Sequence, residues 1–231
     1  MAAAPAETDT AERQPLKARA AWKPTPLLVP AEARDALLMQ ATEAERQGLW
    51  YGNEPLGALD LYAALADADP PMPEARIGRD RIIGLLRERF EAERVAGNLE
   101  TAEEIDAVLE VVSPAEAAGR DEALAAARVA ATATASGDAR REAGQWLAPR
   151  GGSAVAAYRE ALAAVPGFAP ASAGLEGIEQ ALLDRATASL GKGEFDAAEA
   201  DLRRAARVGL DPDAVHAGPQ HPRSALPLRV V

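Results

Sequence analysis

Residues 57–70 read GALDLYAALADADP, and residues 153–166, 96 positions further along the chain, read SAVAAYREALAAVP. The same shift of 96 residues aligns the flanking sequence without a gap, and most of the matched residues are not alanine. A fixed long period of this kind is the signature of a repeat architecture. The residues of the first copy that recur 96 positions later are Gly48, Trp50, Ala58, Tyr62, Ala68, Pro70, Ala75, Gly78, Ile82, Leu86, Arg89, Ala92, Gly97, Ala102, Glu103 and Val112.

The composition predicts an all-α fold. Hydrophobic residues make up 48% of the 231 positions but aromatic residues only 4%, and alanine is abundant throughout. Alanine is the best helix former and is depleted from strands. No interior run alternates β-branched or aromatic residues with polar ones, which is the pattern of a half-buried strand. A core of small side chains with close helix contacts is therefore expected.

Hydrophobic periodicity, glycine and proline divide the chain into about eight helices. We expect a first repeat unit at 31–113 and a second at 114–212, each made of two antiparallel hairpins, with an extended arm at 1–30 and a disordered tail at 213–231. Ser113 and Glu116 are spaced as a capping box for the helix that starts there. Ser136, Gly137 and Asp138 are expected to break that helix. The expected helices are 31–47, 56–68, 74–96, 99–112, 114–135, 153–164, 171–190 and 194–208.

The side chains expected inside are the larger apolar ones of these helices. Tyr62 and Tyr158 lie on single apolar stripes and are predicted core residues. Ile77 is expected to face inward together with Ile82, Leu86 and Phe90 of the same helix. The two tryptophans at equivalent positions, Trp50 and Trp146, are interpreted as packing wedges, with a ligand platform as the alternative. In the arm, 22–30 is apolar enough to dock, either on the chain's own helices or on a partner.

The charge balance narrows the choice of partners. The net charge is −11, and residues 31–113 alone hold 18 acidic and 8 basic side chains, a balance of −10. Nucleic acids and anionic membranes need a basic face, so neither is expected as a partner. No stretch of about 18 apolar residues is present, and the first 30 residues lack the apolar core of a secretory signal. We therefore expect a cytoplasmic protein without membrane insertion.

Three segments resemble tetratricopeptide repeats. In GALDLYAALADADP and SAVAAYREALAAVPGFAPA, the small residue, the tyrosine and the closing proline match landmarks of the second helix of that repeat. The stretch LGKGEFDAAEADLRRAARVGLDP at 190–212 matches best, with glycines in its turn and a proline at its end. The resemblance covers about 34–212. The closing prolines lie 44, 52 and 46 residues apart, whereas the family repeats every 34 residues, which puts a regular superhelical groove in question.

The resemblance implies a right-handed α-solenoid that binds a protein or a peptide and has no chemistry of its own. The predicted function is therefore a non-catalytic adaptor or scaffold, not an enzyme, with no cofactor and no metal. The alternative is an accessory or regulatory helical domain of a bacterial protein, which works with a separate or missing catalytic domain similar to sulfatase-modifying factors. A self-contained α-helical enzyme is a third hypothesis, and a purely structural oligomerisation module is a fourth.

The most suggestive surface is a row of arginines on the helix expected at 74–96. Arg76, Arg87 and Arg94 are spaced by 11 and 7 residues, so they project to nearly the same side of a helix, and Arg79 lies on its flank. Arginine binds carboxylates through two parallel hydrogen bonds, so this row is the predicted partner-binding site. The alternative is ordinary surface pairing, Arg76 with Asp80 and Arg87 with Glu91, each four residues apart.

Overall fold

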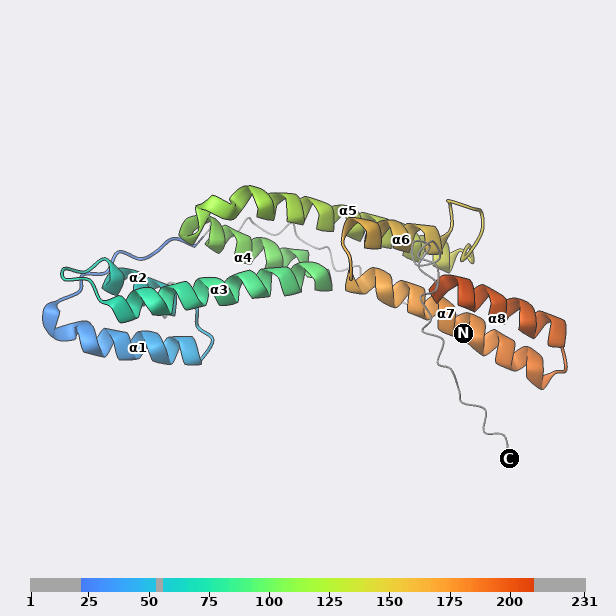
Figure 1. Cartoon of the computed structure of the whole chain (residues 1–231), viewed down its shortest axis with the longest axis horizontal. Coiled ribbons are helices and arrows are strands. Elements are labelled where there is room, and N and C mark those ends of the chain that lie inside the picture. Colours follow the sequence, from blue (N-terminus) through green and yellow to red (C-terminus); the bar gives the residue numbers. More distant parts are fainter. Residues whose placement is uncertain (1–21, 53–55, 210–231) are drawn as a thin grey trace, which may run out of the picture. The chain divides into compact units, whose positions relative to one another are not determined.

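The computed structural model describes residues 22–52 and 56–209. Its regular structure consists of α-helices and two short 3-10 helices, with no β-strand in the described ranges, so the expected all-α class is correct (Figure 1). The elements are η1 Ala31–Ala33, α1 Arg34–Arg46, α2 Ala58–Ala66, α3 Pro73–Ala96, α4 Leu99–Val112, η2 Pro114–Glu116, α5 Ala117–Glu142, α6 Ala154–Ala164, α7 Ala169–Gly191 and α8 Phe195–Gly209.

The chain forms two compact units. Among the described residues, unit 1 comprises 22–52, 56–88 and 104–117, and unit 2 comprises 89–103 and 118–209. Helices α1 and α2 lie in unit 1, whereas α6, α7 and α8 lie in unit 2. Helices α3 and α4 each contribute residues to both units.

Helix beginnings recur at the spacing of the sequence match. Helices α2, α3 and α4 begin at residues 58, 73 and 99, and α6, α7 and α8 begin 96 residues later, at 154, 169 and 195. The turns are alike as well. Gly48 and Gly144 have φ angles of 74° and 73°, and Gly97 and Gly193 have φ angles of 84° and 77°. The helix beginnings and glycine turns related by the shift therefore share their local backbone structure.

The predicted break at Ser136–Asp138 is wrong, because α5 continues without interruption to Glu142. Gly137 is buried within this helix, and a Cβ atom placed on it would come within 2.6 Å of the Tyr158 ring. The glycine is needed for close packing of the helix and not for a turn. The other predicted helices lie within about three residues of their observed ends, apart from 114–135, which extends to 142.

Unit 1 is built around α2, which is buried on nearly every side. Leu59, Leu61, Tyr62 and Leu65 are each at most 1% exposed, so the predicted core tyrosine is confirmed. The prediction for Ile77 is wrong, since its side chain is 64% exposed. The buried face of α3 contains Ala75, Gly78, Ile82 and Leu86, and Ile77 lies about 200° around the helix from the first of these.

The apolar segment at 22–30 lies on the body of unit 1 in an extended conformation. Trp22 is only 9% exposed, and the backbone N–H of Thr25 donates a hydrogen bond to Asp60 of α2 over 2.9 Å. Of the two docking alternatives, the structure therefore shows the segment on the chain's own helices. The remainder of the arm and the tail expected at 213–231 lie outside the described residues.

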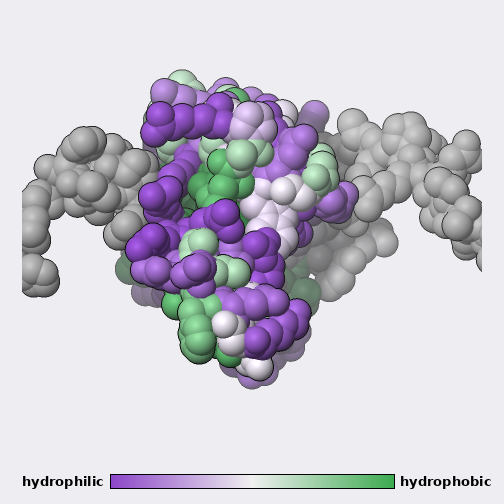
Figure 2. All heavy atoms as spheres, turned by 90° about the vertical axis from the view of Figure 1, so that its right-hand side faces the viewer, coloured by the Kyte–Doolittle hydropathy of each residue, from purple (hydrophilic) through white to green (hydrophobic). Residues whose placement is uncertain are grey.

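Unit 2 has a core of small side chains gathered around a few large ones. Tyr158, Phe168, Ile178 and Leu182 are each at most 1% exposed, and seven buried alanines share their cluster. Apolar surface also remains open on this unit. Figure 2 looks onto the α7–α8 end and shows hydrophobic surface between hydrophilic residues. The exposed large hydrophobic side chains of these helices are Leu190, Phe195 and Leu202. No helix in the described part of the chain combines the length and apolar character needed to cross a bilayer.

The contact between each tyrosine ring and a glycine of the next helix predicts a specific mutational effect. A Cβ atom on Gly78 would lie 2.5 Å from the Tyr62 ring, so Gly78→Ala should destabilise the protein by about 1–3 kcal/mol, the usual cost of overpacking. Gly84 lies in the same helix with no atom near an added Cβ, so Gly84→Ala should stabilise it by about 0.5–1 kcal/mol. Urea denaturation of both variants measures the difference, and equal effects would contradict the contact.

Candidate functional site

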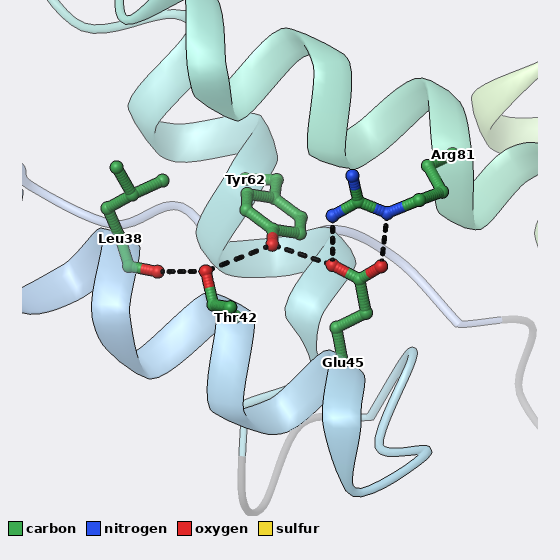
Figure 3. Close-up of polar contacts among 5 residues, drawn as sticks. All are labelled: Leu38, Thr42, Glu45, Tyr62 and Arg81. Atoms are coloured by element: carbon green, nitrogen blue, oxygen red, sulfur yellow. Dashed lines mark hydrogen bonds and ion pairs between the residues drawn. The ribbon is translucent and has the colours of Figure 1, made fainter.

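Polar side chains from three helices meet around Tyr62 in unit 1 (Figure 3). The Tyr62 hydroxyl donates to Glu45 Oε2 over 2.8 Å, and Arg81 Nη2 donates to the same oxygen over 2.6 Å. Arg81 Nε donates to the other carboxylate oxygen, so the Arg81–Glu45 pair is bidentate. Thr42 Oγ1 donates to the carbonyl of Leu38 over 2.9 Å and lies 3.4 Å from the Tyr62 hydroxyl. This network ties α1 to both α2 and α3.

The network changes the acidity of its members in opposite directions. The hydrogen bond from Arg81 lowers the pKa of Glu45, although partial burial acts against it. Burial raises the pKa of Tyr62, and donation to Glu45 raises it further. At neutral pH the cluster therefore contains a carboxylate, a guanidinium and a neutral phenol, and its charges balance.

A hollow of about 260 Å³ opens beside this network. Its lining combines apolar and charged side chains, namely Leu38, Thr42, Tyr62, Glu74, Ile77 and Arg81. The exposure of Ile77 is explained by this position, because the side chain forms part of the wall. Glu74 and Arg81 bring one negative and one positive charge, so the hollow favours neither sign of ligand.

The equivalent tyrosine of unit 2 also donates to a carboxylate, but that carboxylate comes from a different position. The Tyr158 hydroxyl donates to Asp138 Oδ1 over 2.7 Å, and Asp138 occupies the position equivalent to Thr42. The position equivalent to Glu45 is Arg141, whose Nη2 lies 3.6 Å from Asp138 Oδ1. Gly177 replaces Arg81, and a Cβ atom on it would lie 3.2 Å from Arg141 Nη1. The arginine near the tyrosine of unit 2 is therefore Arg141 of α5, which lies over Gly177 of α7.

A second hollow, of about 310 Å³, opens in unit 2 and is here named the Trp146 hollow. Its apolar lining comes from the loop after α5 and from α7, and its charged lining consists of two arginines. The lining residues are Gly144, Trp146, Leu147, Ala148, Leu182, Arg185 and Arg204. The Arg185 guanidinium lies 5.7 Å from the centre of the Trp146 ring, within the range of a cation–π interaction.

One buried carboxylate holds both arginines of the Trp146 hollow. Asp201 is 4% exposed, and its Oδ1 accepts from Arg185 Nη2 over 2.9 Å and from Arg204 Nη1 over 2.7 Å. Arg185 Nε donates to Oδ2 over 3.1 Å. Burial raises the pKa of Asp201, but the hydrogen bonds and charges of Arg204 and Arg185 outweigh it, and the net shift is downward. The site contains two guanidinium groups and one carboxylate, a net charge of +1.

The four predicted arginines are not equivalent in the structure. Arg87 donates to Ser113 Oγ over 2.8 Å and pairs with Glu116 over 2.9 Å. These two residues were expected to form a capping box, but Ser113 makes no side-chain cap hydrogen bond, so that expectation is wrong. Arg94, whose side chain is 16% exposed, pairs with Glu91 over 2.5 Å.

The surface pairs proposed as the alternative reading also differ from those observed. Arg79 Nε lies 3.6 Å from Asp80 Oδ1, the carboxylate that was expected to pair with Arg76. Glu91 pairs with Arg94 and not with Arg87. Arg76 is exposed on α3. Binding of a partner by these arginines stays a prediction.

The Trp146 hollow brings Trp146 together with charged side chains that the sequence analysis did not connect with it. Trp146 is half-buried, packs against the core of unit 2 and donates its indole N–H to the carbonyl of Arg141 over 3.0 Å, as a packing wedge does. The same ring also lines the hollow and contacts Arg185. The sequence analysis did not predict Arg185, Asp201 or Arg204 as site residues. A carboxylate on the apolar face of the amphipathic helix expected at 194–208 was the signal that could have found them.

Acid titration should expose the role of Asp201. Because its folded-state pKa lies below the usual aspartate value of 3.8, its ionised form stabilises the fold above that pH, and this contribution is lost as the pH falls through the folded-state pKa. The free energy of unfolding of wild type relative to Asp201→Asn should therefore decrease as the pH falls below about 3.8. Denaturant titration between pH 2 and 6 checks this, and a difference independent of pH would contradict it.

Alkaline titration should identify Tyr158. Burial, followed by donation to Asp138, raises the pKa of Tyr158 from 10.0 to about 12. The neutral phenol therefore stabilises the fold below about pH 10, and this contribution is lost as the pH rises toward 12. In absorbance titrations at 295 nm, Tyr158→Phe should remove a transition near pH 12. If it removes one near pH 10, the buried hydrogen bond is absent in solution.

Comparison of the chain with protein-family models, with curated proteins and with solved structures yields no match. Function is therefore inferred from the geometry of the described residues.

Proposed function

We propose that this chain is a non-catalytic interaction module, an array of helical hairpins similar to tetratricopeptide repeats. In this proposal the Trp146 hollow binds a protein segment in which a carboxylate lies next to an apolar side chain. The observation that carries the proposal is the pair of half-exposed arginines held over an apolar floor by one buried carboxylate. The side chains of Arg185 and Arg204 are 54% and 49% exposed, whereas that of Asp201 is 6% exposed.

The charge of the hollow supports an acidic ligand. Two guanidinium groups share one carboxylate, so one positive charge remains uncompensated within a chain whose net charge is −11. Each guanidinium has five N–H donors, and the hydrogen bonds to Asp201 occupy only some of them. The free donors of a fixed guanidinium suit the planar geometry of a carboxylate.

The arginines are also held in position before a ligand arrives. Asp201 lies on α8 and accepts hydrogen bonds from both arginines. The Arg185 guanidinium also lies over the indole ring of Trp146. Binding a partner then costs less side-chain entropy than ordering two free arginines would. The apolar floor of Trp146, Leu147 and Leu182 provides the contact for an apolar neighbour of the carboxylate.

The chemistry of the lining supports binding rather than catalysis. Its charged groups are arginines, which stay protonated and do not act as general bases. The carboxylate beneath them accepts three hydrogen bonds, and its pKa is lowered rather than raised toward neutrality. The helix beginnings that recur every 96 residues support the interpretation as a tandem array. A right-handed solenoid and a cytoplasmic location belong to this proposal and stay predictions.

Selection from a random library of 12-residue peptides tests the proposal. The purified full chain should enrich sequences with Asp or Glu beside an aromatic or aliphatic residue. Arg204→Glu should weaken a selected peptide about tenfold or more, a loss of about 1.4 kcal/mol, because it reverses a charge in the lining.

Arg203→Glu is the matched control. Arg203 is the adjacent residue of α8, its side chain is 70% exposed, and it pairs with Glu199 instead of lining the hollow. Arg203→Glu makes the same change of charge as Arg204→Glu, but outside the hollow. It should therefore leave the affinity for the selected peptide within about twofold of the wild-type value. An enriched motif without acidic residues, or equal losses for the two variants, would overturn the proposal.

A further inference from the structure

In unit 1, one carboxylate lies buried on α2 and contacts a segment without regular structure. Asp60 is 1% exposed, and its Oδ1 accepts the backbone N–H of Thr25 over 2.9 Å. Its Oδ2 is buried and has no hydrogen-bond partner among the described residues. A buried carboxylate is costly unless it is hydrogen-bonded, so its place on a helix that is otherwise apolar calls for an explanation.

Comparison with unit 2 shows that the helix itself does not require this aspartate. The position 96 residues later is Ala156 in α6, which is half-buried. Helices α2 and α6 begin at equivalent positions and both carry a buried tyrosine, so the acidic group is not needed to form either helix. The feature specific to unit 1 is the extended segment 22–30 that covers Asp60.

The sequence of that segment, WKPTPLLVP, makes it a stiff ligand with one well-placed donor. Thr25 lies between Pro24 and Pro26, so its N–H is the only backbone donor of the three residues. Each residue that precedes a proline is restricted to extended conformations, which lowers the entropy lost on docking. That single donor is the group that reaches Asp60.

The exposure of the segment follows the alternation of a docked extended chain. Thr25, Leu27 and Val29 are half-buried, whereas Pro24, Pro26, Leu28 and Pro30 are exposed. Alternate side chains of an extended backbone point to opposite sides, so one edge faces the body of unit 1. Trp22 is buried at the start of the segment and acts as its apolar anchor.

We propose that the surface of α2 around Asp60 is a binding site for an extended, proline-spaced segment, and that residues 22–30 are its resident and exchangeable ligand. Two opposing effects make exchange feasible. Burial of the Trp22 ring favours docking, whereas docking also buries Asp60 Oδ2 and the indole N–H of Trp22, neither of which has a hydrogen-bond partner among the described residues. The site lies in unit 1, so this proposal does not depend on the Trp146 hollow.

Binding of the segment in trans tests the proposal on the full chain. The probe is the nine-residue peptide WKPTPLLVP with a fluorophore at its C-terminus, measured by fluorescence anisotropy. The host is the double variant Trp22→Ala, Thr25→Pro, which lacks both the anchor and the donor of its own segment. The peptide should bind this host at least about tenfold more tightly than it binds the wild-type protein. In the wild-type protein the tethered segment competes with the peptide at a high effective concentration.

Two changes test the hydrogen bond itself. In the released host, Asp60→Ala should weaken the peptide about tenfold, whereas Asp60→Asn should retain most of the affinity, because its amide oxygen still accepts the N–H. The control peptide WKPPPLLVP lacks that N–H and should bind about tenfold more weakly than the parent peptide.

The proposal is overturned if the released host does not bind the peptide, if the control peptide binds equally well, or if Asp60→Ala leaves the affinity unchanged. Circular dichroism must show unchanged helix content in each host. The single variant Thr25→Pro keeps Trp22 and provides the same comparison should the double variant lose helix.

Discussion

The packing of each unit depends on a tyrosine ring pressed against a glycine. In unit 1 the Tyr62 ring occupies the space above Gly78, and in unit 2 the Tyr158 ring occupies the space above both Gly174 and Gly137. An added Cβ atom at any of these glycines would lie within 2.6 Å of the ring. Large rings are scarce in this chain, so the core is formed by close approach of backbones around a few of them. Alanine and glycine on the facing helices permit that approach.

A buried phenol in such a core needs a hydrogen-bond partner, and each unit provides a carboxylate in its own way. Tyr62 donates to Glu45, whereas Tyr158 donates to Asp138, which is equivalent to Thr42. The positive charge also comes from a different helix, because Arg81 lies on α3, whereas Arg141 lies on α5 and covers Gly177 of α7. In both units the tyrosine hydroxyl has a hydrogen-bond acceptor, but the charged residues around that hydroxyl differ. The same backbone thus presents different polar surfaces.

The two proposed binding sites share one physical device, a buried aspartate on a helix. Asp201 fixes two arginines at the surface of unit 2, and Asp60 holds an extended segment on unit 1. The position equivalent to Asp201 is Ile105, and the position equivalent to Asp60 is Ala156, so each aspartate departs from its repeat. Burying a carboxylate is unfavourable for stability alone. Such departures are expected where a site, rather than the fold, determines the residue.

The amino-acid sequence by itself determined the all-α class, the helix beginnings and the core tyrosines, because these follow from local propensity and from the 96-residue match. It did not predict that α5 passes through Gly137, since a glycine within a helix and one at a break look alike until the opposing Tyr158 ring is known. The orientation of Ile77, the partners of Arg87 and the pairing of Arg185 with Asp201 also required the tertiary structure. These features depend on contacts between helices that are distant in sequence. A local sequence pattern does not predict which polar groups such packing brings together.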